Sequence, residues 1–152
     1  MSVNVRIATL SPEDVRRYIR EPEVYLSDLP SAVEINLRRD WDALHCLLTG
    51  SVNPGRGPLA FIKTGGHDLN MGANQRLFRP PAVRRIHAAL SALPMTVCRK
   101  RFKDVVRNDD DVYPGTWDEH SEGLLFDWVK ELKTMMRRAA KQGHCLIYAD
   151  DA

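Results

Sequence analysis

The chain has 152 residues, of which 43% are hydrophobic and 28% charged, and its formal net charge is +2. This length suits one domain with a sizeable core, and the near balance of 22 basic and 20 acidic residues argues against a nucleic-acid partner. Three widely spaced cysteines without a CxxC pair indicate neither a disulfide framework nor a zinc ribbon. No apolar run is as long as a membrane helix and no signal peptide is evident, so we expect a cytoplasmic protein without a membrane partner.

The first predicted element is a strand over residues 3–10, where apolar and polar residues alternate. A short helix follows, because Ser11 is a good N-cap and Pro12 suits the first helical position. Residues 21–32 are expected to form a loop with a short helical turn. An amphipathic helix ending at Gly50 is then predicted by residues at helical spacing, namely Leu37, Trp41, Leu44, His45 and Leu48.

The middle of the chain is less regular. The apolar run LAFIKTGG at residues 59–66 predicts a short buried strand, and the polar segment 67–81 predicts a surface loop. Apolar residues at helical spacing predict a helix over residues 83–93. Residues 95–106 favour another helix, because the segment does not alternate as a strand would.

The clearest helical pattern lies near the C-terminus, where apolar residues repeat from Leu124 to Ala139 before Gly143 stops the helix. Residues 144–150 then predict a strand. A strand at each end of the chain with helices between them predicts an α+β fold in a single compact domain over residues 1–152. In this fold a small mixed or antiparallel sheet includes both terminal strands and packs against several helices, among them the long C-terminal one.

Candidate chemistry is sparse. No histidine lies in a metal-binding motif such as HExxH, so we expect neither a metal nor a cofactor, and we assign no catalytic residue. His45 has two interpretations. Beside Trp41 in a cleft, its imidazole would be a working group with a pKa lowered by burial. In the core it would be neutral and bonded to a backbone carbonyl or to an acid such as Asp42, and its apolar neighbours favour this second interpretation.

Two aromatic residues, Tyr113 and Trp117, flank a Pro-Gly turn just before the long helix. Aromatic side chains beside a rigid turn can line a pocket or anchor a partner, and they can equally fix the turn to the core. Cys98 lies beside three basic residues, which can lower the pKa of a thiol, but no orienting histidine is identifiable.

Three segments together resemble the YfbM-like family, a bacterial family of small proteins with a domain of unknown function. The resemblance implies a compact α+β fold and no established activity, cofactor or catalytic residue. It also favours five residues as candidates for binding a ligand or partner, namely Trp41, His45, Arg76, Tyr113 and Trp117. The segments are DWDALHCLLTG with Trp41, Leu44 and His45, NMGANQRLFRPPAVRRIHAAL with Gly72, Arg76 and Pro80, and YPGTW with Tyr113, Pro114 and Trp117.

Arg76 of the second segment precedes a predicted helix. It could bind an anionic ligand or a partner carboxylate, or it could cap backbone carbonyls of its own loop. The sequence alone favours neither use over the other.

Two functions stay open. The first is a non-catalytic module that binds a protein partner, in the manner of an antitoxin or immunity protein, and it requires an exposed patch with aromatic or arginine anchors. The second is an enzyme or small-molecule-binding domain whose pocket gathers Trp41, His45, Arg76 and Tyr113. This second function requires His45 to line a concave cavity that solvent can reach.

Overall fold

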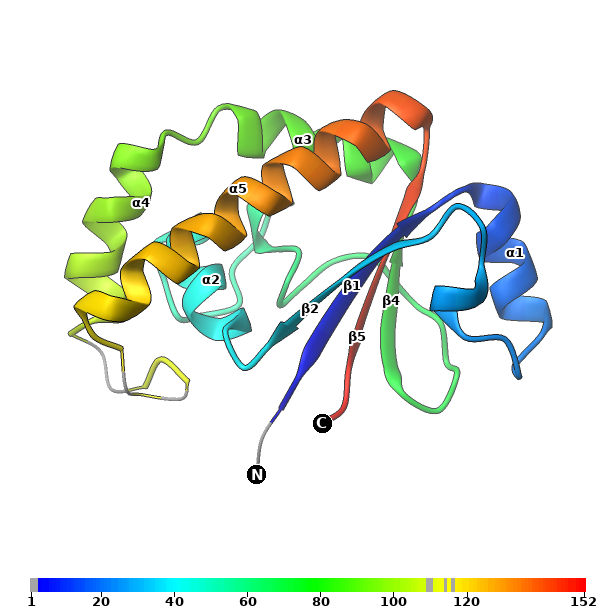
Figure 1. Cartoon of the computed structure of the whole chain (residues 1–152), viewed down its shortest axis with the longest axis horizontal. Helices are drawn as coiled ribbons and strands as arrows, with labels where there is room; N and C mark the ends of the chain where they lie inside the picture. Colours follow the sequence, from blue (N-terminus) through cyan, green and yellow to red (C-terminus); the bar gives the residue numbers. More distant parts are fainter. Residues whose placement is uncertain (1–2, 109–110, 114, 116) are drawn as a thin grey trace.

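The computed structural model describes residues 3–108, 111–113, 115 and 117–152. Within these residues, five strands form one sheet in which every neighbouring pair is antiparallel (Figure 1). Both terminal strands belong to the sheet, as predicted, and they pair with each other. The strands are β1 (Val5–Leu10), β2 (Val33–Arg38), β3 (His67–Asp68), β4 (Asn74–Phe78) and β5 (Cys145–Asp150), in the spatial order β2-β1-β5-β4-β3.

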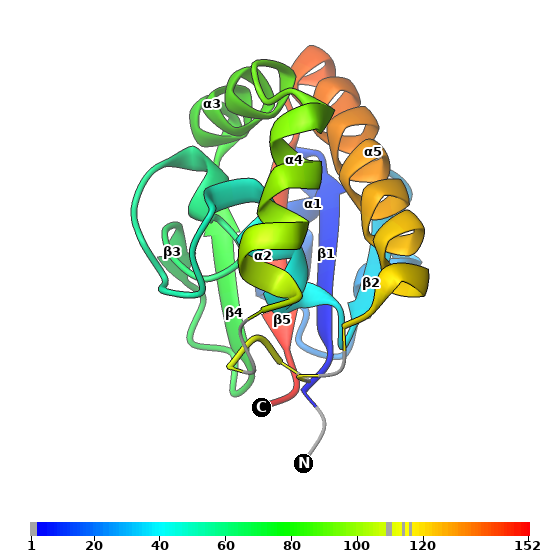
Figure 2. The same cartoon turned by 90° about the vertical axis from the view of Figure 1, so that its left-hand side faces the viewer.

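Five α-helices, counted over the same residues, cover the two faces of the sheet unequally (Figure 1). They are α1 (Pro12–Arg20), α2 (Trp41–Thr49), α3 (Pro80–Ser91), α4 (Met95–Arg101) and α5 (Glu119–Gln142). Helix α1 packs on one face, and the other four pack on the opposite face. Figure 2 shows α4 in front of the sheet, with α3 and α5 on either side of it. Three shorter helical segments are η1 (Leu26–Asp28), η2 (Pro58–Ala60) and η3 (Phe102–Val106).

The hydrophobic core is divided in two by the sheet. Successive residues of a strand point to opposite faces, so β5 contributes to both halves. Leu146 and Tyr148 belong to the larger cluster beneath α2–α5, whereas Cys145 and Ile147 pack in the smaller cluster with α1. Burial on both faces explains why this strand has an unbroken apolar run instead of an alternating pattern.

Most of the predicted elements are confirmed. The Ser11 hydroxyl accepts the Asp14 N–H at 3.1 Å and caps α1, and Pro12 opens the helix. The segment 95–106 is helical throughout, since the π-helical η3 continues α4. The long C-terminal helix and the closing strand are α5 and β5, and Gly143 between them has a φ of 68°.

The helix predicted from Leu37 is too long at its start. Leu37 lies on β2 and is fully buried, while α2 begins at Trp41. Arg38 ends the strand with a φ of 53°, and the Asp40 N–H then donates to the Leu37 carbonyl at 3.0 Å. Leu37 and Trp41 are four positions apart and therefore fit a helical stripe, although Leu37 lies near the end of a strand.

Two predictions for the middle of the chain are wrong. The run at 59–66 forms no strand in the described structure, because η2 and a following turn occupy it, and the N–H groups of Lys63 and Thr64 donate to the Ala60 carbonyl. The segment 67–81 is not a surface loop, because it contains β3 and β4. The polar residues of β4 suggest a loop when they are read locally. The groups that bind Gln75 and Arg76 lie far away in the sequence, so the local pattern does not reveal them.

Candidate functional site

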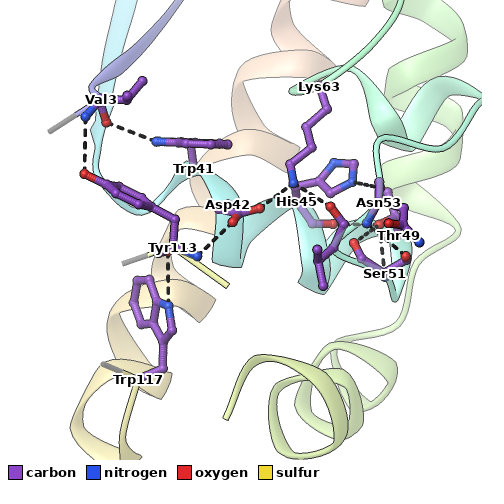
Figure 3. A network of polar contacts seen from close by, with 11 residues as sticks. Val3, Trp41, Asp42, His45, Thr49, Ser51, Asn53, Lys63, Tyr113 and Trp117 are labelled. Atoms are coloured by element: carbon purple, nitrogen blue, oxygen red, sulfur yellow. Dashed lines mark hydrogen bonds and ion pairs between the residues drawn. The ribbon is translucent and has the colours of Figure 1, made fainter. Parts of the chain in front are cut away.

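The start of α2 holds two of the candidate residues against the N-terminal segment (Figure 3). The Trp41 indole Nε1–H donates to the Val3 carbonyl at 3.0 Å, and the Val3 N–H donates to the Tyr113 hydroxyl at 3.2 Å. The rings of Trp41 and Tyr113 stack, with centroids 5.6 Å apart and an interplanar angle of 26°. These contacts join the segment before β1, α2 and the connection before α5.

A buried ion pair lies directly beneath this stack (Figure 3). Asp42 Oδ1 is 2.5 Å from the Lys63 ammonium, and Asp42 Oδ2 accepts the Tyr113 N–H at 2.8 Å. The two side chains are only 6% and 15% exposed. Lys63 also donates to the Val52 carbonyl at 2.6 Å and lies 5.6 Å from the centroid of the Trp41 ring. Sequence reasoning missed Lys63. Its one local signal is its position directly after the apolar run of residues 59–62.

Trp117 is attached to the same cluster from the other side. Its indole N–H donates to the Tyr113 carbonyl at 3.2 Å, so this hydrogen bond links the two aromatic residues of the YPGTW segment directly. Trp117 is half-buried and packs against the larger core. Pro114, which the family pattern places between them, lies outside the described residues.

His45 is one turn further along α2 and has no exposed surface. Its Nε2–H donates to the Asn53 carbonyl at 2.8 Å, so the partner is a backbone carbonyl and not Asp42. The other ring nitrogen, Nδ1, has no hydrogen-bond partner within the described residues. Burial lowers the pKa of the imidazole, partly offset by the hydrogen bond to Asn53. We therefore describe His45 as a neutral imidazole packed in the core.

This burial makes stability depend on pH. Below the ordinary histidine pKa of 6.5, the unfolded chain takes up a proton that the folded ring does not. The free energy of unfolding is therefore expected to fall with decreasing pH, by at most about 1.4 kcal/mol per pH unit, until the folded pKa is reached. A His45→Gln variant keeps a side-chain N–H donor but cannot titrate. Urea unfolding at pH 7.5 and 5.5 should show a smaller difference between wild type and variant at the lower pH, and an unchanged difference would contradict the burial of a neutral ring.

Arg76 lies apart from these residues, on β4. Its guanidinium donates to three backbone carbonyls of the segment after η2, those of Gly65 at 2.8 Å, Phe61 at 3.0 Å and Ile62 at 2.7 Å. It also stacks over the Tyr148 ring, 4.2 Å from the centroid. Arg76 thus caps backbone carbonyls, which was one of the two uses predicted for it. These carbonyls belong to residues 61–65 and not to its own segment, which is strand β4.

The neighbour of Arg76 on β5 is equally enclosed. Burial and a hydrogen bond to Asp150 raise the pKa of the Tyr148 hydroxyl, which stays protonated and donates to Asp150 Oδ2 at 2.8 Å. Desolvation in turn lowers the pKa of Arg76 from its ordinary value. The guanidinium therefore faces a neutral aromatic ring and three carbonyl dipoles.

The described residues provide neither an activated cysteine thiol nor a cluster of metal ligands. Cys98 is fully buried on α4, and this burial raises the pKa of its thiol despite the nearby Arg101. Within residues 3–108, 111–113, 115 and 117–152, no group of three or more His, Cys, Asp or Glu side chains is placed to hold a metal ion. In that same part of the chain, no helix has the length and apolar character needed to cross a membrane.

The main hollow on the α1 side of the sheet is built from other residues. A cavity of about 580 Å³ lies between the segment after α1 and the sheet, and a second of about 510 Å³ adjoins it, since Arg6 and Ala149 line both. We call the first the α1-side groove. Its lining is mixed. We call the apolar residues Ile19, Val24, Tyr25, Leu26 and Met71 its wall and the polar strand residues Arg6, Glu34 and Gln75 its floor, and Ser27, Asn70 and Ala149 also line it.

The structure thus brings together four of the five sequence candidates, Trp41, His45, Tyr113 and Trp117, and leaves Arg76 elsewhere. None of these five lines the α1-side groove. Their role in binding a ligand or partner stays a prediction, whereas their contacts within the chain are explicit. Sequence reasoning missed the groove, because its residues come from β1, β2, β4, β5 and the segments flanking them and share no local motif.

Comparison with known proteins supports the fold. Residues 1–149 match a family described as "Domain of unknown function (DUF1877)". A solved structure, that of a protein of unknown function, YfbM from Escherichia coli, is similar with a TM-score of 0.71 and 24% sequence identity, over 99% of this chain and 100% of that one. No curated protein matches the chain significantly. At this identity the structural likeness shows the fold alone, but the family match spans nearly the whole sequence, and the chain therefore belongs to the DUF1877 family of domains of unknown function.

Proposed function

We propose that the chain is a protein-binding module whose partner docks in the α1-side groove. The observation behind this proposal is that two exposed large hydrophobic side chains lie on the wall of one hollow. Tyr25 is 74% exposed and Ile19 is 45% exposed. Single exposed apolar residues are ordinary on a protein surface, but their grouping beside a hollow is typical of a binding site.

The polar floor of the groove indicates what the partner should carry. The Arg6 guanidinium is 4.0 Å from the Glu34 carboxylate, and the two side chains are 62% and 27% exposed, so this ion pair is weak. A partner carboxylate could pair with Arg6 while an apolar side chain beside it packs between Tyr25 and Ile19. The partner we infer is therefore a protein segment with an apolar residue next to an acidic one.

The groove is also partly rigid before any partner arrives. Below the wall, the Tyr18 hydroxyl donates to Gln75 Oε1 at 2.9 Å, and both side chains are buried. This contact ties α1 to β4 and holds the floor in place. A preformed surface lowers the ordering cost of association, which favours docking with little rearrangement.

The alternative function, a small-molecule pocket around His45, has less support. It requires the imidazole to face a cavity that solvent can reach, but His45 has no exposed surface. It also requires Arg76 to converge on the same space, whereas that guanidinium is engaged by the carbonyls of Phe61, Ile62 and Gly65.

Replacing Tyr25 with alanine should weaken capture of the partner without unfolding the chain. The tagged protein would be used to capture proteins from a lysate of the organism that encodes it, and the affinity of the recovered partner would then be measured. We expect a loss of about thirtyfold for Tyr25→Ala, because a tyrosine at the centre of an interface typically contributes about 2 kcal/mol.

Leu124 provides a matched control. It is an exposed apolar residue of α5, 53% exposed, and is not part of the groove. Leu124→Ala should bind as wild type does, and Arg6→Gln should weaken binding together with its salt dependence. A partner whose affinity is unchanged by Tyr25→Ala and by Ile19→Ala would show that docking happens at another surface.

A further inference from the structure

A second hollow, of about 470 Å³, lies on the face of the sheet opposite the α1-side groove. It is formed between α5 and the outermost strand, β2, which lie at the same side of the sheet (Figure 2). We call it the α5-side hollow. Its volume is within the range of pockets that bind small molecules. Its apolar lining consists of Val33 and Ile35 of β2 and Met135 of α5.

A threonine hydroxyl without a protein partner belongs to the lining of this hollow. Thr9 of β1 is only 3% exposed, and its side chain makes no hydrogen bond within the described residues. The hydroxyl oxygen is not among the atoms that the fold seals off completely, so solvent reaches it through the hollow. A hydroxyl buried to this extent usually has a hydrogen-bond partner. The Thr9 hydroxyl is therefore available to a bound ligand.

The C-terminal end of α5 lies beside Thr9. The helix ends at Gln142, and the chain then enters β5, whose first residue Cys145 pairs with Leu10, the residue after Thr9. Arg138 lines the hollow about one turn before this end of the helix. The topology therefore places Arg138 at the end of the hollow that contains Thr9.

The charges of the lining are balanced at one end of the hollow and unbalanced at the other. Lys130 and Glu131, about two turns before Arg138, are neighbours with opposite charges. Arg138 forms no ion pair within the described part of the chain, and no acid lies within one turn of it on α5. A guanidinium and a hydroxyl can both donate hydrogen bonds to a carboxylate. The hollow thus combines an apolar stretch with one end suited to an anion.

We propose that the α5-side hollow binds a small carboxylic acid with an apolar chain. The carboxylate pairs with Arg138 and accepts a hydrogen bond from Thr9. The chain lies along Ile35 and Met135. Arg138 and Glu131 are seven residues apart, about 10 Å along the helix axis, which suits a chain of medium length. This site lies on the other face of the sheet from the proposed docking groove and does not depend on it.

An added strand is the competing occupant, because β2 is the edge of the sheet and Val33 is 55% exposed. The end of β2 is a poor template for such a strand. Arg38 has a φ of 53°, and its N–H donates to the Asn36 side chain at 2.9 Å. The Leu37 carbonyl is also engaged, since it accepts the Asp40 N–H. An irregular edge hinders further pairing, which favours a small ligand over a strand.

NMR titration of the isotope-labelled full chain with octanoate, below the concentration at which it forms micelles, tests the proposal. Octanol and octylamine are the uncharged and cationic analogues. We expect saturable shifts at the amides of Thr9, Ile35 and Arg138. Octanoate should bind about tenfold more tightly than octanol, because hydrogen bonds to a charged group are stronger than those between neutral groups.

Two neighbouring arginines provide a matched pair of variants. Arg138→Gln should remove the preference for octanoate over octanol, and Arg138→Glu should reverse it in favour of octylamine. Arg137 is also exposed but does not line the hollow, so Arg137→Gln should leave the preference intact. Octanoate that causes no saturable shift in the hollow would overturn the proposal, and so would a preference that Arg138→Gln leaves unchanged.

Thr9→Val separates a ligand-binding hydroxyl from a structural one. Because the wild-type hydroxyl has no partner within the described residues, the unliganded variant should unfold at the same temperature as wild type or slightly higher. Its affinity for octanoate should nevertheless fall by about fivefold or more. A variant that loses stability but not affinity would show that the hydroxyl serves the fold. A protein segment that protects the β2 amides from exchange, with no binding of octanoate, would assign the hollow to an added strand.

Discussion

Replacing Asp42 with alanine is expected to lower the free energy of unfolding by about 3–5 kcal/mol, the range observed when one partner of a buried ion pair is removed. The reason is that the Lys63 ammonium would remain in the interior without its counter-charge. Its other hydrogen-bond acceptor is the Val52 carbonyl, which cannot neutralise it. The Tyr113 N–H would lose its acceptor as well. Urea unfolding at neutral pH would measure the loss.

A double-mutant cycle separates the charge effect from lost packing. Lys63→Met keeps most of the volume of the lysine side chain and removes its charge, so adding it to Asp42→Ala should recover part of the stability. We expect the double variant to be more stable than the sum of the two single losses by about 1–3 kcal/mol, as residues in direct contact show. Losses that simply add would contradict an energetic role for the ion pair.

Replacing Arg76 with alanine should have the second largest effect, a loss of about 2–4 kcal/mol, because hydrogen bonds to charged groups are strong and three carbonyl acceptors would lose their donor together. These carbonyls belong to the segment after η2, whose Phe61 and Ile62 side chains are buried in the larger core. Loss of the guanidinium should therefore also increase amide hydrogen exchange in residues 58–66. Urea unfolding and hydrogen exchange would measure the two effects.

Two further variants test the geometry of this contact. Arg76→Lys keeps the positive charge but replaces a planar fork by a single ammonium, so it should recover only part of the stability. Arg84, an exposed arginine of α3, is the matched control, and Arg84→Ala should change stability by about 0.5 kcal/mol or less. If Arg76→Lys were as stable as wild type, charge alone would account for the role of Arg76, and the three-carbonyl geometry would be unimportant.

Both positions bear on the segment between α2 and β3. Arg76 binds carbonyls of residues 61–65 from the β4 side. Lys63, in the same stretch, pairs with Asp42 of α2 and donates to the Val52 carbonyl near the start of the segment. The sequence predicts a strand there, because an apolar run is compatible with any buried conformation. Hydrogen-bond partners decide the outcome: the N–H groups of Lys63 and Thr64 donate to the Ala60 carbonyl in a turn, and pairing with β4 begins only at His67.

Strand β4 shows the converse case. Its polar residues favour a surface loop when read locally, yet Gln75 is buried and Arg76 half-buried. Burial is possible because Tyr18 of α1 satisfies Gln75 and because carbonyls from residues 61–65 satisfy Arg76. A polar side chain can lie in the interior only where partners are present, and local sequence does not contain those partners.

By itself the sequence determines the elements whose signals are local. Hydrophobic periodicity and end signals place β1, α1, α5 and β5, and the apolar neighbours of His45 favour its burial, because side-chain spacing along a helix or strand dictates which face is covered. The tertiary structure alone decides the Asp42–Lys63 pair, the place of Arg76, the α1-side groove and the α5-side hollow. Each of these depends on which distant segments meet, and the free energy of a polar or exposed group is set by what lies opposite it in space.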